Sequence, residues 1–344
     1  MTSPFPSPKP TDAPGPSAEQ ERAQLMPERD LVGYGRHVPV VQWPNQARVA
    51  VSLVLNYEEG SERSYAFGDD SNESLGEIGR PVSPGYRDLA TESVYEYGSR
   101  AGVFRLLRLF DQKQVTCTFF AAAVALERNP QVGEWIQQAG HEPCAHGWRW
   151  SEEWGLTREE EAHRIALAVQ SIRATCGERP VGWYSRWMPS PRTRELLVAE
   201  GGFLYDSNAY NDDLPYYVRV GQTWHLVVPY SLTYNDVRYV SGATGSPREL
   251  LDACCRGLDY LWDEGESAPR MLSLGLHARF SGQAGRASAV RDFIDYALDK
   301  GGVWFARRRD IAQWWLDHVP PPGEENSRNR TAPAASQHSH RLPP

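Results

Sequence analysis

The chain has 344 residues, of which 40% are hydrophobic and 23% are charged, so it is long enough for one domain with a well-buried core. Its net charge of −8 provides no basic surface, which argues against nucleic acid or an anionic membrane as a partner. No apolar run is long enough to span a bilayer, and no apolar segment follows a basic start at the N-terminus. We therefore expect a cytoplasmic protein that acts on a small molecule.

The cysteines agree with a reducing compartment. There are five of them, an odd number, and none has CxxC spacing, so neither a zinc ribbon nor a disulfide framework is expected. Residues 1–28 and 319–344 are rich in proline and polar residues and lack periodicity, as is typical of disordered tails. The sequence between them, 29–318, is expected to form a single domain.

Short β-rich runs alternate with helical patterns along this domain. The expected strands are Val49–Leu55, Val115–Ala121, Glu142–Ala145, Val181–Ser185, Phe203–Tyr205, Leu226–Pro229, Met271–Leu276 and Val303–Ala306. The expected helices are Ser93–Asp111, a helix that a capping box at Thr157–Glu160 opens and Gly177 closes, Pro191–Glu200, Pro247–Glu264 and Arg286–Lys300.

This alternation predicts an α/β fold with a parallel sheet of seven or eight strands. We favour a (β/α) barrel, and a doubly wound open sheet is the alternative, because periodicity alone does not separate the two. No GxGxxG follows the first strand and no P-loop occurs, so the usual phosphate-binding motifs of an open sheet are missing from the sequence.

Polar and ionisable residues follow several of the expected strands directly. In a barrel of this kind, functional side chains lie at the carboxyl ends of the strands. A single histidine in such a position is more often a hydrogen-bonded core residue than a catalyst, but a convergence of several acids, histidines and arginines is hard to explain by packing. The residues concerned are Glu58, Glu59, His146, Tyr184, Arg186, Asp206, His277 and Arg279.

Several motifs resemble those of the polysaccharide deacetylase superfamily of distorted (β/α) barrels, in particular its branch of deacetylase-like allantoinases and related cyclic-amide hydrolases. The resemblance covers nearly the whole domain and implies a hydrolase of carbon–nitrogen bonds that assembles as a homo-oligomer, by resemblance a tetramer. The stretches that carry it are Arg29–Arg36, Asn56–Gly60, Glu92–Gly102, His146–Trp150, Glu200–Ser207, Asp212–Tyr216 and Leu276–His277.

The chain departs from this family where a metal would bind. The resemblance implies Asp-Asp after the first strand and His-x-x-x-His after the third, but this chain has Glu58-Glu59 and places Trp150 at the second histidine position. A catalytic metal needs about three protein ligands, and an indole nitrogen is only a donor. We therefore expect no cofactor. A zinc or other divalent ion would have to rely on Glu59 and His146, with Glu58, Asp206 or Asp212 swinging in.

Without a metal, a carboxylate or a histidine must activate water. We expect Glu58 to be the general base, with a pKa raised towards neutrality by burial and by Glu59. His277 is the candidate to protonate the leaving nitrogen, and His146 would orient water or substrate. Which glutamate acts as the base is left open. The expected substrate-binding residues are Trp148, Trp150, Tyr184, Arg186, Asp206 and Arg279, with Arg186 or Arg279 stabilising the oxyanion.

The leading functional hypothesis is a hydrolase of a small cyclic amide such as allantoin, a hydantoin or an imide. The stretch Gly182–Pro191 differs from that of the allantoinases it resembles, so the reaction class is better supported than the substrate. The alternatives are a metal-dependent deacetylase of N-acetylated sugars and a non-catalytic small-molecule binding protein. Glu96 and Arg100 are expected to form a helical ion pair.

Overall fold

The computed structural model describes residues 29–74, 82–240 and 246–324. The expected N-terminal tail, 1–28, and all but the first six residues of the expected C-terminal tail lie outside these ranges. Within them, no helix has the length and apolar character needed to cross a membrane. The five cysteines are free thiols, and four of them are buried.

Nine strands form one sheet across the described residues, and all eight expected strands are among them. Their order is β6-β7-β5-β4-β3-β2-β1-β8, with β9 paired to the first part of β1. Their bounds are β1 (Val49–Tyr57), β2 (Thr118–Ala121), β3 (Glu142–Ala145), β4 (Gly182–Trp183), β5 (Tyr205–Asp206), β6 (Tyr216–Val220), β7 (Thr223–Val227), β8 (Arg270–His277) and β9 (Val303–Phe305).

The sheet winds in one direction, as a barrel does. β1 to β5 and then β7 follow one another in space, whereas a doubly wound sheet would reverse its order in the middle. All pairs are parallel except the hairpin of β6 and β7. The ends of the strand path, β8 and β6, are not paired, so the barrel is distorted and incomplete. The expectation of a distorted α/β barrel with seven or eight parallel strands is confirmed in the form of a partial barrel, and β6 is an addition.

β1 is mostly apolar and pairs with three strands, β2, β8 and β9. All nine of its residues are buried, as is typical of a parallel strand covered on both faces. Eight of them pair in register with β8, from Val49 opposite Arg270 to Asn56 opposite His277. Alternate residues belong to different parts of the core: Val51 and Leu53 lie in one hydrophobic cluster, and Val54 in the other.

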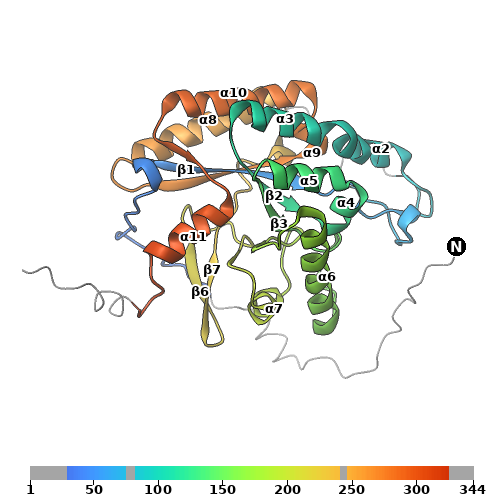
Figure 1. Cartoon of the computed structure of the whole chain (residues 1–344), viewed down its shortest axis with the longest axis horizontal. Helices are drawn as coiled ribbons and strands as arrows, with labels where there is room; N and C mark the ends of the chain where they lie inside the picture. Colours follow the sequence, from blue (N-terminus) through green and yellow to red (C-terminus); the bar gives the residue numbers. More distant parts are fainter. Residues whose placement is uncertain (1–28, 75–81, 241–245, 325–344) are drawn as a thin grey trace, which may run out of the picture.

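Helices cover the outside of the sheet, and α3, α8 and α10 lie side by side along one part of it (Figure 1). The α-helices are α2 (Leu89–Tyr97), α3 (Val103–Lys113), α4 (Ala123–Arg128), α5 (Pro130–Gln138), α6 (Arg158–Cys176), α7 (Thr193–Glu200), α8 (Pro247–Glu264), α9 (Ala278–Ser281), α10 (Ala284–Lys300) and α11 (Arg308–His318). Short 3₁₀ turns are η1 (Pro44–Gln46), η2 (Tyr65–Phe67) and η4 (Asp236–Tyr239), and η3 (Gly98–Gly102) is a π-helical turn.

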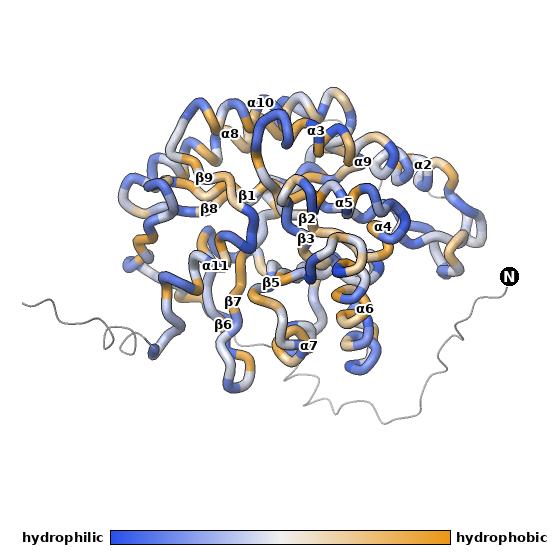
Figure 2. The backbone as a smooth tube through the Cα atoms, in the orientation of Figure 1, coloured by the Kyte–Doolittle hydropathy of each residue, from blue (hydrophilic) through white to orange (hydrophobic). Residues whose placement is uncertain are grey.

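Local sequence explains the ends of α6. The Thr157 hydroxyl oxygen accepts a hydrogen bond from the backbone N–H of Glu160, and the Glu160 carboxylate accepts one from the backbone N–H of Thr157. At the other end Gly177 has a φ of +74°, a left-handed conformation that glycine adopts at no steric cost. Between these caps, hydrophobic and hydrophilic stretches alternate along the helix (Figure 2). The expected capping box and C-terminal glycine are both confirmed.

The expected helix Ser93–Asp111 is wrong as a single helix. It is divided into α2 and α3 by the π-helical turn η3. The reason lies in close packing: a side chain on Gly102 would place its Cβ 2.1 Å from the carbonyl oxygen of Ala278, and one on Gly282 would meet Gly102. The two backbones touch directly, and the extra residue of the turn aligns them. Such turns are frequent at functional sites.

Candidate active site

The first strand delivers Glu58 and Glu59 into a tight turn, as the sequence predicts. The amide of Ser61 bonds the carbonyl of Glu58 at 2.9 Å, and Gly60 has a φ of +89°, which explains the glycine at that position. His146 follows β3 directly, and His277 is the last residue of β8. Because β1 lies next to β8 and one strand from β3, all three tips meet at the carboxyl edge of the sheet.

Glu58 is the centre of this arrangement. Its Oε1 atom lies 3.3 Å from Nε2 of His146 and 3.6 Å from Nε2 of His277, and its Oε2 atom accepts a hydrogen bond of 2.7 Å from Nη1 of Arg279. Glu58 is only 1% exposed. The carboxylate therefore joins residues from three strand ends, and Oε1 is the oxygen that faces both imidazole rings.

Glu59 has a different environment, as expected for adjacent residues on an extended chain. Its Oε1 atom accepts the backbone N–H of Arg279 at 3.0 Å, and its Oε2 atom accepts that of Glu58 at 2.9 Å. The Cα of Gly98, in the π-helical turn, lies against this carboxylate, because a Cβ there would sit 2.5 Å from Oε1. Glu59 thus ties together the β1 turn, the start of α9 and η3.

The expected rise in the pKa of Glu58 is wrong. Burial raises the pKa of this carboxyl, but the positive charges of Arg279 and His277 outweigh it and hold the pKa well below its ordinary value. The raised pKa belongs to Glu59, where burial prevails over Arg279 and the neighbouring Glu58 adds to the rise. Glu62, in the same loop, also has a pKa raised by burial, to about 7.

The hydrogen bonds of His146 define its tautomer. Its Nδ1 atom lies 2.7 Å from the backbone carbonyl of Tyr184, which only accepts, so Nδ1 carries the proton. Its Nε2 atom lies 3.1 Å from the indole nitrogen of Trp150, which only donates, and 3.3 Å from Oε1 of Glu58, which only accepts. The contact with the indole is the shorter of the two, so we assign Nε2 as the acceptor of the Trp150 N–H, with Glu58 beside this bond.

His277 is held by Asp236, which sequence reasoning missed. The Nδ1 atom and the backbone N–H of His277 lie 2.6 Å and 2.7 Å from the two oxygens of Asp236, and Ser281 donates a further bond of 2.6 Å. The buried carboxylate keeps the Nδ1 proton in place. Nε2 of His277 is left facing Glu58, so the ring can carry a proton to or from that point.

The three aromatic residues expected to bind substrate differ from one another in their contacts and burial. Tyr184 stacks on the His146 ring, with centroids 5.0 Å apart, and its hydroxyl bonds that of Tyr210 at 2.8 Å. Trp150 is 2% exposed and forms the wall beside His146. Trp148 is only half-buried and packs against the main hydrophobic core, and its substrate-binding role stays a prediction.

Two other expected substrate-binding residues are buried in ion pairs. Arg186 bonds Glu73 at 2.8 Å and the backbone carbonyl of Trp150 at 2.8 Å. Asp206, at the tip of β5, is paired with Arg194 at 2.7 Å and with His225 at 3.0 Å, and its pKa lies below its ordinary value because these charges outweigh its burial. Among the described residues, no hydrogen bond or ion pair joins Asp206 to Glu58, His146 or His277.

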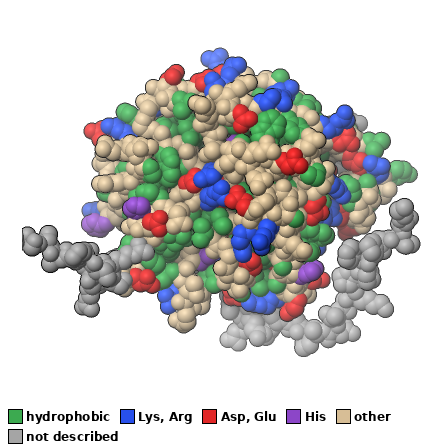
Figure 3. Space-filling view, in the orientation of Figure 1, with side chains coloured by type: hydrophobic (Ala, Val, Ile, Leu, Met, Phe, Trp, Pro, Cys, Tyr) green, Lys and Arg blue, Asp and Glu red, His purple; other side chains and the backbone are tan. Residues whose placement is uncertain are grey.

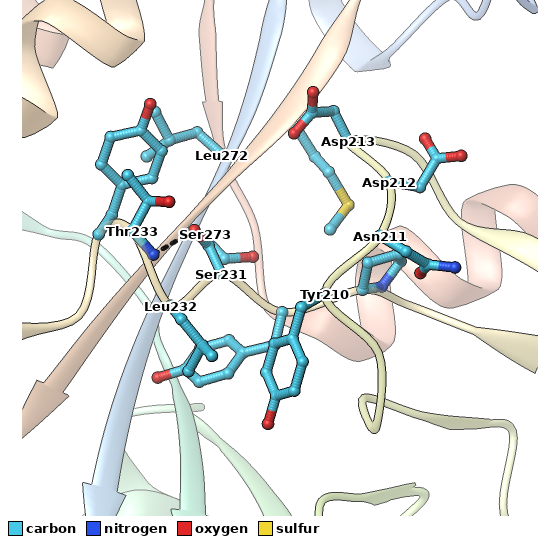
Figure 4. Close-up of a pocket in the computed structure, with 13 residues that line it drawn as sticks. Tyr210, Asn211, Asp212, Asp213, Ser231, Leu232, Thr233, Leu272 and Ser273 are labelled. Carbon is cyan, nitrogen blue, oxygen red and sulfur yellow. Dashed lines mark hydrogen bonds between the residues drawn. The ribbon is translucent and has the colours of Figure 1, made fainter. Parts of the chain in front are cut away.

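A pocket of about 520 Å³ lies in the gap of the barrel, between the first half of β8 and the segments before and after the β6–β7 hairpin (Figure 4). Asp212 and Asp213 line one side of it, and Ser231 and Thr233 the other. Tyr230 lies between this pocket and the strand tips, since it lines the pocket while its hydroxyl accepts a hydrogen bond of 3.2 Å from Asn56.

The charges on the surface are mixed. On the face seen in Figure 3, lysine and arginine side chains are interspersed with aspartate and glutamate. The expectation that nucleic acid is not a partner stays a prediction. The exposed Glu96 and Arg100 lie 3.9 Å apart, which is the helical ion pair predicted for them.

Comparison with known proteins decides the family. A Schizosaccharomyces pombe protein described provisionally as a polysaccharide deacetylase is 36% identical over 318 residues, which cover 85% of this chain and 98% of that protein. The chain belongs to the polysaccharide deacetylase family. The family model "Polysaccharide deacetylase" matches residues 92–188. A Helicobacter pylori "Peptidoglycan deacetylase" is 32% identical over 141 residues, 41% of this chain and 48% of that protein.

Two solved structures share the fold at higher identity. One, from Pseudomonas aeruginosa PAO1, is described as a "probable Polysaccharide deacetylase"; it is 44% identical with a TM-score of 0.81, over 85% of this chain and 99% of the other. The second is described as "Puue Allantoinase" and is 43% identical with a TM-score of 0.81, over 85% of this chain and 98% of the other. The expected polysaccharide-deacetylase-like fold is confirmed, and the chain is a hydrolase of this family.

The residues present do not fit the family's metal. Trp150 cannot coordinate, and its N–H fills the Nε2 lone pair with which His146 would bind an ion. Both carboxylate oxygens of Glu59 accept backbone N–H groups. In the described part of the chain, no group of three or more His, Cys, Asp or Glu residues has the arrangement of a metal site. The expectations of a cytoplasmic location and of a homo-oligomer stay predictions.

Proposed function

We propose that this protein hydrolyses the amide carbon–nitrogen bond of a small cyclic amide, of the class of allantoin, hydantoins and cyclic imides, without a catalytic metal. The observation that carries the proposal is the hydrogen bond from the indole of Trp150 to Nε2 of His146. It takes the place of the bond to a metal and leaves water activation to the carboxylate and imidazole groups around Glu58.

In this proposal Glu58 is the general base. Its lowered pKa keeps it ionised throughout the neutral range, and Arg279 holds Oε2 so that Oε1 faces the reacting centre. Oε1 takes a proton from a water molecule, whose oxygen attacks the carbonyl carbon of the amide. His146, with its Nε2 atom 3.3 Å from Oε1, forms one side of the position in which this water is held.

His277 supplies the proton to the leaving nitrogen. In its imidazolium form the ring donates Nδ1–H to Asp236 and has its second proton on Nε2. When the carbon–nitrogen bond breaks, this proton passes to the nitrogen. The proton that Glu58 took from water then moves from Oε1 to Nε2 of His277, across the 3.6 Å between them, and the site is restored. One water molecule is consumed in each cycle.

Two further observations support a small substrate. Within the described residues, Glu58, His146 and Trp150 are each at most 2% exposed, so these groups do not lie on an open surface. The alignment with the similar structure described as an allantoinase covers 98% of that structure's chain. Both observations favour a compact ring over a polysaccharide.

A metal-dependent deacetylase of N-acetylated sugars is the second candidate. The relatives described as a polysaccharide and a peptidoglycan deacetylase favour it. It requires that the hydrogen bond from Trp150 to Nε2 of His146 break and that a third protein ligand for the metal take the position of Trp150. A non-catalytic binding protein on the same scaffold is the third candidate, and it assigns no role to the contacts between Asp236, His277 and Glu58.

The test is a substrate panel of allantoin, hydantoin, a dihydropyrimidine, succinimide and N-acetylglucosamine oligomers, with and without a chelator. We expect turnover of at least one cyclic amide, unchanged after chelation, and loss of that turnover in Glu58→Gln and His277→Ala with the fold intact. Deacetylation of the oligomers that zinc restores after chelation would establish the second candidate instead. No turnover of any compound would favour the third.

A further inference from the structure

The side chain of Arg186 lies between two indole rings. Its guanidinium carbon is 3.8 Å from the ring centroid of Trp150 on one side and 4.3 Å from that of Trp187 on the other. Arg186 and Trp150 are 3% and 2% exposed, whereas Trp187 is 46% exposed. A planar guanidinium stacks on aromatic faces in a way that an ammonium group does not. Arg186 therefore packs directly behind the indole of Trp150.

The polar ends of Arg186 are fixed as well. One guanidinium nitrogen donates to the backbone carbonyl of Trp150 at 2.8 Å, and another lies 2.8 Å from the carboxylate of Glu73, whose side chain is 3% exposed. Glu73 belongs to the loop after β1, and Arg186 to the loop after β4. The pair thus connects two distant loops, and it holds both the ring and the backbone of Trp150.

The orientation of Trp150 matters because its other edge faces the catalytic residues. Its indole nitrogen donates to Nε2 of His146, and the guanidinium of Arg279 lies 5.3 Å from the opposite side of the ring. A rotation of the indole would leave a buried N–H without its acceptor and expose the Nε2 lone pair. The contacts of Arg186 oppose that rotation.

We propose that Arg186, anchored by Glu73, is a positioning residue that holds Trp150 so that its indole N–H occupies Nε2 of His146. The pair thereby keeps the indole N–H against Nε2 of His146, where it takes the position that a metal ion would need. This inference gives Arg186 a role other than the substrate contact expected from the sequence. It rests on the metal-free mechanism proposed above for its catalytic consequence, but the contact itself needs no substrate.

The test is Arg186→Lys, which keeps the positive charge but loses the planar stack and the simultaneous contacts with the Trp150 carbonyl and Glu73. Nitrogen-15 NMR reports the tautomer of His146, and hydrogen exchange reports the indole N–H of Trp150, both without substrate. In the wild type we expect a single Nδ1–H tautomer and a slowly exchanging indole N–H. In Arg186→Lys we expect exchange at least tenfold faster and a signal for protonated Nε2. With a turned-over amide, kcat should fall at least tenfold and KM change less than twofold.

Arg179→Lys is the matched control. Arg179 is also paired with a glutamate, Glu200 at 2.8 Å, and lies over an aromatic ring, Phe203 at 5.8 Å, but it has no contact with Trp150. It should leave both NMR signals and kcat unchanged. Glu73→Gln serves as a second variant if Arg186→Lys fails to fold, and it should show the same changes in smaller measure.

The outcomes separate this inference from the proposed function. Unchanged His146 and Trp150 signals in folded Arg186→Lys and Glu73→Gln would overturn the positioning role. Unchanged signals with a large rise in KM would instead make Arg186 a substrate contact. If the signals change as expected but the protein turns over no amide, the positioning role stands and the proposed function fails.

Discussion

Gly98 allows the π-helical turn to approach the catalytic carboxylates, and Gly98→Ala is the sharpest perturbation of the site. An added Cβ would lie 2.5 Å from Oε1 of Glu59, 2.7 Å from its Cγ and 2.8 Å from the backbone nitrogen of Arg279. Ordinary contact begins near 3.4 Å, so Glu59 must retreat by roughly 0.9 Å and Arg279 by about 0.6 Å. Neither displacement is free, because the two residues are hydrogen-bonded to each other.

The expected cost follows from these displacements. Overpacking of this size destabilises a core by about 1–3 kcal/mol. A shift of about 1 Å at a catalytic group costs on the order of 100-fold in rate. Since Arg279 also holds Glu58, we expect kcat/KM for the amide that the substrate panel identifies to fall about 100-fold in Gly98→Ala. Urea denaturation should show a free energy of unfolding about 1–3 kcal/mol lower.

Gly285→Ala is the matched control for this prediction. Gly285 lies in the first turn of the helix α10, is exposed, and would have no atom within 4 Å of an added Cβ. It should keep wild-type activity and gain a few tenths to about 1 kcal/mol in stability, because alanine favours a helix. Wild-type activity and stability in Gly98→Ala would refute the claim that this close approach positions the carboxylates.

Three further predictions concern the metal, the proton relay and pH. Trp150→His should bind Zn²⁺ measurably by calorimetry, and the wild type should not. The control is Trp154→His, which changes an exposed indole in the same loop and should not bind Zn²⁺ either. Equal binding by all three proteins would contradict the inference that the indole N–H of Trp150 blocks Nε2 of His146. Asp236→Asn should lower kcat about 10²–10⁴-fold with little change in Tm, because the His277 tautomer is no longer fixed, and an unchanged kcat would remove Asp236 from the mechanism. Burial raises the pKa of Glu153 to about 7, so the folded state favours the protonated carboxyl group. The stability that this group contributes is therefore fully present below the unfolded pKa of about 4.3 and is lost as the pH rises through 7. Glu153→Gln should therefore flatten the decline in the free energy of unfolding between pH 5 and 8 by up to about 3 kcal/mol, whereas the exposed Glu195→Gln should leave that slope as in wild type.

The strand tips were predictable because each is a local pattern. An apolar β-branched run that ends in an acid or a histidine places that residue at the carboxyl edge of a parallel sheet, and Glu58, His146 and His277 meet there as expected. β6 was not predicted, since its residues are half-exposed and give no clear alternation. The π-helical turn at Gly98 was hidden by apolar positions that continue at helical spacing on both sides.

The residues that sequence reasoning missed act across long distances along the chain. Asp236 lies in a 3₁₀ turn within an irregular segment, 41 residues before His277, and no periodicity marks it. The pKa of Glu58 was misjudged for the same reason. Its adjacent acid is visible in the sequence, but the guanidinium that outweighs burial comes from Arg279, 221 residues further on. Local patterns supply the positions of side chains, whereas their charges depend on partners that only the fold brings near.

The sheet that carries these residues is unevenly hydrogen-bonded along its width. β1 pairs with β8 over eight residues, whereas β3 and β4 share a single pair and β4 and β5 share two. Local opening depends on how many such bonds must break together, so amide protons of β1 and β8 should exchange only on global unfolding and those around β4 and β5 much sooner. Glu58 and His277 thus lie on the strands that share the most hydrogen bonds, and Tyr184 follows a strand that shares the fewest. We therefore expect the spacing of Glu58 and His277 to persist when the region around β4 and β5 opens.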